Sequence, residues 1–170
     1  MKEAPKMLKY RYCTPEWLDE SARIYRSTSH FEEKLKKLSE GVCFRVKAEP
    51  AWGIEQDILF GAFVEAGQLT KLGFFSEEAA KREANYIMSA TPQEWKKILR
   101  KENKFLTDFM LGRIKLEKGS KVTILGLAPY APLLIDALTQ VQIEFPDELT
   151  SEELIKYRAY MEEFRKNINV

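Results

Sequence analysis

The chain has 170 residues, of which 45% are hydrophobic and 31% are charged, and its formal net charge is +1. This composition is ordinary for a single globular domain that is large enough to bury a core. A net charge so close to zero gives the protein no overall positive potential that would attract nucleic acid.

Cys13 and Cys43 stand in no metal or redox spacing, and the N-terminus carries no signal-peptide pattern. We therefore expect free thiols in a reducing, cytoplasmic protein. Only four Asn and five Gln stand beside many Lys and Glu, a balance that leans towards a thermophilic source. No cofactor is expected.

Helices are predicted near the N-terminus. Residues 1–12 are basic and aromatic, and they are expected to form a loosely attached arm. Thr14 is a suitable N-cap, followed by Pro15 at the first helical position, so a helix is predicted over residues 14–26. A second helix is predicted over residues 31–39, stopped by Gly41.

From residue 42 onwards, the apolar residues recur with a period of two. Alternation predicts a strand with one wet face over residues 42–48, and residues 58–65 are apolar on both faces, as in a central strand. Residues 69–74 follow a Gly-containing turn, and a fourth strand is predicted over 85–89 after a short helix, 77–83. These four strands are expected to form one mostly antiparallel sheet.

Helices and short strands alternate in the second half of the chain. A capping box at Thr91 and Glu94 opens a helix, and a second short helix is expected over residues 105–111. A fifth strand is predicted over 113–117, and a last short strand over 141–145. Thr150 and Glu153 form another capping box, which opens a C-terminal helix that extends to about residue 167.

Residues 122–135 form an uncharged apolar run that contains Pro129 and Pro132. The run is too short and too rich in proline to span a bilayer, so it is expected to be a helix interrupted near Pro129 and resumed to Leu138. It must be buried against protein or against a bound apolar ligand.

The order of these elements resembles the sterol carrier protein-2 (sterol-binding) domain family. The resemblance is carried by the strand at Ile87-Met88-Ser89, the helix start at Thr91, Phe109-Met110-Leu111-Gly112, the alternating residues 113–117, Gly119, and the apolar run. It covers residues 35–145, with one extra residue between Gly112 and Gly119 and two prolines in the apolar helix as departures. It implies an α/β (α+β) fold, in which helices and a five-stranded, mostly antiparallel sheet surround a hydrophobic tunnel.

On this basis three segments are expected: an N-terminal arm and helical extension (1–34), a lipid-binding domain (35–145), and a C-terminal helix on the same domain (146–170). The residues predicted to line the cavity are large and apolar and come from both the sheet and its covering helices: Phe60, Ile87, Trp95, Phe105, Phe109, Met110, Ile114, Leu127 and Leu134. A basic cluster is either a solvated helix face or a headgroup site at the cavity mouth, and its candidates are Lys97, Arg100 and Lys101.

No constellation for catalysis is expected. His30 is the single histidine and follows Ser27-Thr28-Ser29, but neither a Gly-x-Ser-x-Gly motif nor a phosphate-binding Gly-rich loop occurs. No His/Cys cluster predicts a metal site.

The sequence therefore predicts a non-enzymatic carrier of a lipid-like molecule, such as a fatty acid, a fatty acyl-CoA, or a sterol-like or isoprenoid-like compound. The alternative is an accessory subunit of an enzyme complex that handles acyl-CoA or another hydrophobic substrate. Transient contact with a membrane surface and a second copy as partner both stay open, as does a C-terminal helix that covers a cavity mouth or joins a second subunit.

Overall fold

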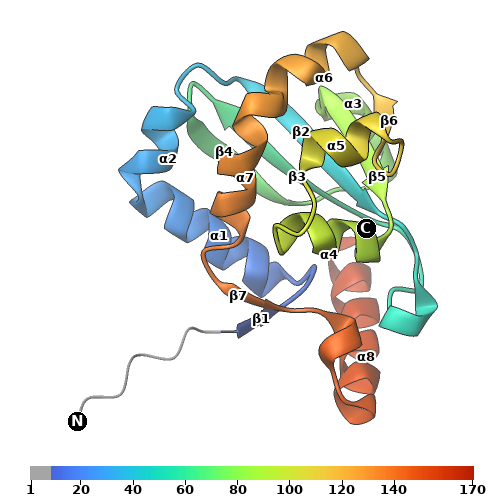
Figure 1. Ribbon diagram of the computed structural model, residues 1–170. Helices are drawn as coiled ribbons and strands as arrows, with labels where there is room; N and C mark the ends of the chain where they lie inside the picture. Colours follow the sequence, from blue (N-terminus) through green and yellow to red (C-terminus); the bar gives the residue numbers. More distant parts are fainter. Residues whose placement is uncertain (1–8) are drawn as a thin grey trace.

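The computed structural model describes residues 9–170, and Figure 1 shows how its elements are arranged. A five-stranded sheet has the order β4-β3-β2-β5-β6, and helices cover it. β2 and β5 are parallel, whereas the other three pairings are antiparallel. In chain order the elements are β1 (Lys9–Arg11), α1 (Pro15–Ser27), α2 (Ser29–Lys34), β2 (Glu40–Val46), η1 (Pro50–Trp52), β3 (Ile58–Glu65), β4 (Gln68–Phe74), α3 (Glu77–Glu83), β5 (Tyr86–Ala90), α4 (Pro92–Leu99), α5 (Phe105–Met110), β6 (Lys115–Lys118), α6 (Lys121–Leu127), η2 (Ala128–Tyr130), α7 (Ala131–Leu138), β7 (Gln142–Glu144), η3 (Pro146–Glu148) and α8 (Ser151–Ile168).

The predicted mostly antiparallel sheet is confirmed. β3 spans the predicted residues, and the other four predicted strands of the sheet occur within a few residues of their expected bounds. The apolar run is helical and is interrupted by the 3-10 turn η2 around Pro129, because proline lacks an N–H and restricts the preceding turn.

The two faces of the sheet pack against different elements. Val42 and Phe44 of β2 belong to the large core cluster, which also contains residues of α1, α4, α5, α6 and α8. Cys43, between them on β2, belongs to a smaller cluster with Phe75 and with Ala80 of α3. Successive side chains on a strand point to opposite faces, so the large cluster marks the inner face and α3 covers the other face.

The expected arm at residues 1–12 is corrected in its last part, while residues 1–8 lie outside the described chain. β1 pairs in parallel with β7, and together they form a separate two-stranded sheet. Tyr12 is fully buried, and its ring lies 4.9 Å from that of Phe145. The last predicted strand therefore pairs with the N-terminal segment and not with the main sheet.

The second helix is shorter than predicted. α2 ends at Lys34, and Leu35 and Leu38 then turn inwards and are buried in the cluster that contains Tyr25 and Phe31. The helix predicted to residue 39 would have included both leucines. The chain instead uses these residues to turn into β2.

α8 packs on the core of its own chain. Tyr157, Met161 and Phe164 are buried, and the Tyr157 hydroxyl donates a hydrogen bond of 2.6 Å to the Tyr12 carbonyl oxygen. The rings of Phe164 and Phe74 (β4) lie 5.0 Å apart. One core cluster thus contains residues from the N-terminal segment, the sheet and α8.

The run Lys121–Leu138 is, within the described residues, the one helix that is long and apolar enough to cross a membrane, with a mean hydropathy of 1.4. It is broken at η2, and its residues Ile124 and Ala137 are buried in the core clusters. One such segment does not indicate a membrane protein. Only 17% of the run is buried, so a largely apolar helix pair with an exposed outer side roofs the inner face of the sheet.

Candidate ligand-binding cavity

Two adjoining cavities lie between the inner face of the sheet and the roof formed by α6, η2 and α7. One, of about 40 Å³, extends towards α1 and includes Ser21 and Tyr25 in its lining. The other, of about 80 Å³, extends towards α4 and α5. Both are bounded by a shared set of apolar residues: Val42, Phe44, Leu127, Leu134 and Leu138. We treat them as the two ends of one cavity.

Residues of the sheet and of the roof line this cavity, and local sequence patterns place them there. Val42 and Phe44 alternate along β2, and their neighbours in register, Ala62 and Phe60 on β3, share the inner face. The roof contributes Leu127 from α6 and residues of α7, which the turn at η2 redirects. The remaining lining at the α4 end comes from Tyr12, Met88, Trp95, Ile98, Leu99, Phe105, Ile124, Ala131 and Ile135.

The lining is almost wholly apolar and has no positive charge. Neither end includes a Lys, Arg or His among the described residues, and Glu40 is the one ionisable carboxylate. The Trp95 indole N–H is already satisfied, because it donates to the Arg45 carbonyl oxygen at 2.9 Å. An environment of this kind accepts hydrocarbon and excludes a buried anion.

The structure brings together five of the nine residues predicted to line the cavity, namely Phe60, Trp95, Phe105, Leu127 and Leu134. Phe109 and Ile114 are buried in the same core cluster but do not line the cavity. Ile87 lies on the opposite face of the sheet, and Met110 has 67% of its surface exposed. We therefore remove these last two from the proposed lining.

Several lining residues were missed by the sequence prediction. The alternation over residues 42–48 already placed Val42 and Phe44 on one face, and it could have identified them. The sequence prediction chose Ile87 and not its neighbour Met88. Successive residues of a strand point to opposite faces of the sheet, so an error of one position places the predicted residue on the face away from the cavity. Tyr12 and Ser21 lie outside the segment of the family resemblance, although helical spacing placed Ser21 on the same face of its helix as Trp17 and Tyr25.

Two of the three predicted mouth residues are paired within the protein. Arg100 is 2.7 Å from Glu148 and also donates to the Ile143 carbonyl oxygen, and Lys101 is 2.7 Å from Asp136. Lys97 is exposed. A headgroup role for these side chains stays a prediction, and an incoming anion would compete with the existing carboxylates for Arg100 and Lys101.

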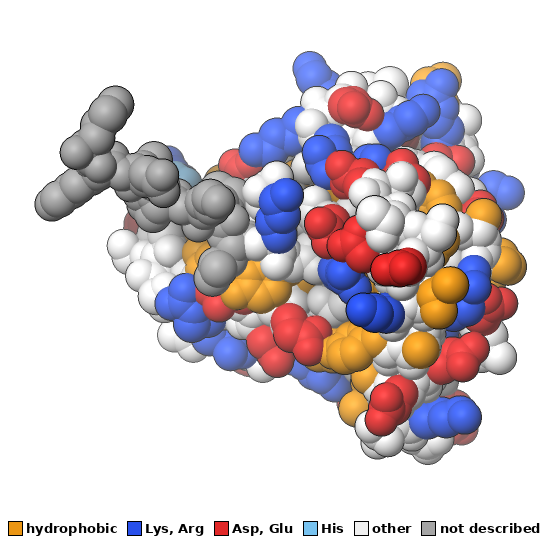
Figure 2. All heavy atoms as spheres, turned by 90° about the horizontal axis from the view of Figure 1, so that it is seen from below, with side chains coloured by type: hydrophobic (Ala, Val, Ile, Leu, Met, Phe, Trp, Pro, Cys, Tyr) orange, Lys and Arg blue, Asp and Glu red, His pale blue; other side chains and the backbone are white. Residues whose placement is uncertain are grey.

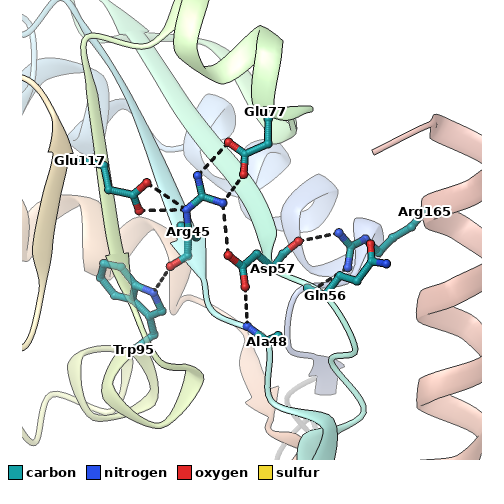
Figure 3. Close-up of polar contacts among 8 residues, drawn as sticks. All are labelled: Arg45, Ala48, Gln56, Asp57, Glu77, Trp95, Glu117 and Arg165. Atoms are coloured by element: carbon teal, nitrogen blue, oxygen red, sulfur yellow. Dashed lines mark hydrogen bonds and ion pairs between the residues drawn. The ribbon is translucent and has the colours of Figure 1, made fainter.

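The outer face of the sheet holds a polar cluster around Arg45, which Figure 3 shows. Its guanidinium forms a two-bond contact with Glu77 and lies 2.9 Å from Glu117 and 3.3 Å from Asp57. Strong hydrogen bonding to Glu77, ahead of the other causes, raises the pKa of Arg45. This cluster joins β2 to α3, to β6 and to the loop before β3, so it is explained by packing.

No arrangement for nucleophilic or metal chemistry is found in the part of the chain that the structure describes. His30 is exposed on α2 and stacks edge-on against Phe31. Residues 9–170 contain no group of three or more His, Cys, Asp or Glu that could hold a metal ion. Burial, as the largest cause, raises the pKa of Cys43 to about 11, so this thiol stays protonated.

The fold and cavity define an α/β domain that encloses an apolar space between a mixed sheet and a broken helical roof. Solved structures show which fold this is. A protein of Thermus thermophilus, described as a conserved hypothetical protein and candidate sterol carrier protein, matches 83% of this chain and 97% of its own, with a TM-score of 0.67 and 19% identity. A crystal structure of sterol carrier protein 2 matches 75% of this chain and 97% of its own, with a TM-score of 0.63 and 21% identity. The unliganded sterol carrier protein 2 of Yarrowia lipolytica matches 74% of this chain and 88% of its own, with a TM-score of 0.52 and 12% identity.

The chain therefore has the sterol carrier protein 2 fold. At the level of sequence, no family model and no curated protein matches it.

Proposed function

We propose that this protein is a non-catalytic carrier that binds a lipid-like molecule between its sheet and the α6–η2–α7 roof. The observation that supports this function most directly is the apolar cavity, which this chain places inside a sterol carrier protein 2 fold. Binding would be driven by removal of apolar surface from water, at about 25 cal/mol per Å². The fatty acid, acyl-CoA and sterol-like candidates all contain enough hydrocarbon to benefit from such transfer.

Ligand entry requires the cavity to expand. Its two ends have volumes of about 40 and 80 Å³, whereas binding pockets for small molecules occupy about 300–1,000 Å³. The roof is the element suited to move, because it is broken at η2 and few of its residues are fully buried. An outward shift of α6 and α7 would separate Leu127 and Leu134 from Phe44 and enlarge both ends together.

Exchange of ligand with a membrane would use α5 and the start of α6. These helices lie at the upper end of the molecule in Figure 1, and their residues Phe105 and Ile124 line the cavity. Their outward side chains form what we call the α5–α6 apolar surface: Leu106, Met110, Leu111, Val122 and Leu125 are 43–80% exposed. The exposed lysines around it, Lys104, Lys115 and Lys121, form no ion pair with another described residue, so the complementary partner is an anionic bilayer.

Filling the cavity tests the carrier function. Leu134→Trp places a larger ring at the junction of the two ends, and we expect it to reduce binding of the neutral fluorophore Nile red at least tenfold. The matched control is Leu106→Trp, since Leu106 is 44% exposed on α5 and does not line the cavity. Equal binding by Leu134→Trp and the parent would overturn the proposed site.

Organic extraction of the native protein followed by mass spectrometry would identify a retained ligand. In contrast, stable co-elution with another protein, together with no retained lipid and no binding of Nile red, would favour the accessory-subunit alternative.

A further inference from the structure

Asp108 is a charged side chain in the interior of the protein. It lies in α5, is fully buried, and accepts hydrogen bonds from the Asn103 amide at 3.1 Å and from Nη1 of Arg113 at 3.0 Å. The backbone N–H of Arg113 also donates to the Asp108 carbonyl oxygen, at 2.9 Å. A buried ion pair often adds no more stability than apolar side chains of the same volume would add. Stability alone therefore does not account for a charge at this position.

The pair holds a guanidinium at the protein surface. The Arg113 side chain is 51% exposed, whereas the Asp108 side chain is 1% exposed. Nη1 is the one guanidinium nitrogen of Arg113 that bonds to another described residue, so Nε and Nη2 are left for an acceptor from outside. Because Asp108 already restrains this side chain, a second partner would bind it with a smaller loss of conformational entropy.

Arg113 stands next to two exposed apolar side chains of the α5–α6 apolar surface. Met110 and Leu111 are 67% and 63% exposed at the end of α5, and Gly112, with a φ of 78°, turns the chain between them and Arg113. An arginine in such a place can lay its hydrocarbon stem along apolar groups while its charged end stays in a polar layer. The two apolar side chains would enter a bilayer at the depth where the guanidinium meets the phosphates.

Charge around this turn favours an anionic partner. Five basic residues lie within residues 102–121: Lys104, Arg113, Lys115, Lys118 and Lys121. Two of the three acidic residues of this segment are bonded to arginines, Asp108 to Arg113 and Glu117 to Arg45 at 2.9 Å. The four lysines therefore stand against a single exposed carboxylate, Glu102, and their excess charge attracts anionic groups.

We propose that Arg113, positioned by the buried Asp108, binds the phosphate group of a membrane phospholipid and anchors the end of α5 on the bilayer. This inference rests on the proposed function and adds a phosphate site to the surface through which ligand would be exchanged. A guanidinium can bind phosphate oxygens through two parallel N–H bonds, which a lysine ammonium cannot do. The site thus recognises phosphate itself, including that of a lipid with no net charge.

Arg113→Lys tests the site, because it keeps the positive charge and removes the planar fork. Vesicle sedimentation compares phosphatidylcholine with digalactosyldiacylglycerol, two lipids without net charge of which only the first contains phosphate. We expect the parent to bind phosphatidylcholine about fivefold to tenfold more tightly, and Arg113→Lys to lose this preference. Arg82→Lys is the matched control, since Arg82 is exposed on α3, which covers the other face of the sheet, and it should keep the preference.

Asp108→Asn tests the positioning role. It retains the shape of the side chain but removes the charge that restrains Arg113, so the preference for phosphatidylcholine should fall. Binding of Nile red without vesicles should stay at the parental level in both variants, because Asp108 and Arg113 do not line the cavity. An unchanged phosphate preference in Asp108→Asn would show that the pair is only structural. Arg113→Lys, an exchange at the surface, decides the phosphate site even where Asp108→Asn lowers the stability.

Two results would overturn the proposal and leave the carrier function standing: equal binding of both lipids by the parent, or a phosphatidylcholine preference that survives in Arg113→Lys. Inorganic phosphate distinguishes a bilayer anchor from a site for free phosphate. At equal ionic strength we expect it to displace the parent from vesicles no more than chloride does. Saturable displacement that Arg113→Lys removes would assign the site to free phosphate and overturn the membrane anchor. Failure of the parent to bind Nile red would overturn the carrier function, whereas the lipid preference would still decide the phosphate site.

Discussion

Arg45 shows how one residue can organise the outer face of the sheet. Its side chain is 11% exposed and forms ion pairs with Asp57, Glu77 and Glu117, which belong to three different segments. Its carbonyl oxygen accepts from the Trp95 indole on the inner face. The residue therefore connects the polar cluster on one side of β2 to the cavity wall on the other. Loss of one partner of a largely buried cation is costly, because it leaves charge uncompensated.

The ion pair between Arg45 and Glu77 predicts that the stability of the protein depends on pH. Hydrogen bonding to Arg45, as the largest cause, lowers the pKa of Glu77 below its ordinary value of 4.5. A carboxyl group with a lowered pKa in the folded state adds stability above its unfolded pKa, and this stability is lost as the pH falls through the folded pKa. Because the Glu77 side chain is 53% exposed, we expect Glu77→Gln to lower the melting temperature at about pH 7 by only about 1–3 °C.

The same substitution should have less effect at about pH 3 than at about pH 7, because the stability that comes from the lowered pKa of Glu77 declines once the pH falls below the ordinary carboxyl pKa. Thermal unfolding at both pH values measures the difference. Glu78→Gln is the matched control, because Glu78 is an exposed neighbour in the first turn of α3 that pairs with no described residue. An equal loss at both pH values would assign the effect to packing.

At the scale of elements, α8 packs on the core through a narrow line of buried side chains. Tyr157, Met161 and Phe164 are buried at spacings of four and three residues, whereas Ile155 and Ile168 are 64% and 47% exposed. An isolated helix of this length is marginal in water, so these few contacts hold it in the folded state. Ile155 lies off this line of buried residues, so a charged residue there would be solvated, whereas Ile168 continues the line at the exposed end of the helix.

We therefore expect Met161→Lys to destabilise the protein by about 3 kcal/mol or more, because it buries a charge without a partner. Ile155→Lys on the same helix should change stability by no more than about 0.5 kcal/mol. Urea unfolding followed by circular dichroism distinguishes the two. If Met161→Lys retained the stability of the parent but exchanged Nile red faster, α8 would be a detachable cover of the cavity.

At the scale of the whole molecule, the face seen from below mixes charges of both signs (Figure 2). Figure 2 shows the lower face, where basic and acidic side chains are interspersed around small apolar areas. The net charge of +1 agrees with this distribution. The α5–α6 apolar surface, at the upper end in Figure 1, differs because its hydrophobic residues are 43–80% exposed and its lysines lack paired carboxylates among the described residues. We expect the molecule to approach a bilayer with that end.

Vesicle sedimentation tests this orientation. The parent should bind vesicles that contain phosphatidylglycerol more tightly than pure phosphatidylcholine, and added salt should weaken the difference. Met110→Glu combined with Val122→Glu should reduce binding to the anionic vesicles at least tenfold. Ile155→Glu is the control, since it replaces an equally exposed apolar residue on α8. Loss of binding in Ile155→Glu alone, or unchanged binding in the double variant, would contradict the proposed surface.

The sequence by itself determined the strands, the break in the apolar helix and the mostly antiparallel sheet. Each depends on a local pattern: apolar residues on both faces of β3, Thr14-Pro15 and Thr91-Pro92 at helix starts, and Pro129 within the roof. These patterns act over a few residues, because capping, proline geometry and alternation are properties of neighbouring backbone units.

Only the tertiary structure decided which side chains meet at the cavity. Ile87 and Met88 are adjacent and similar in character, yet just one faces the roof, and that choice depends on the register of β5 with β2. Tyr12 and Ser21 reach the cavity because β1 pairs with β7, 133 positions away, and α1 packs on β4 and α7. The reason is physical: the identity of an element follows from short-range preferences, whereas the position of a side chain in a site follows from packing between distant segments that no local pattern encodes.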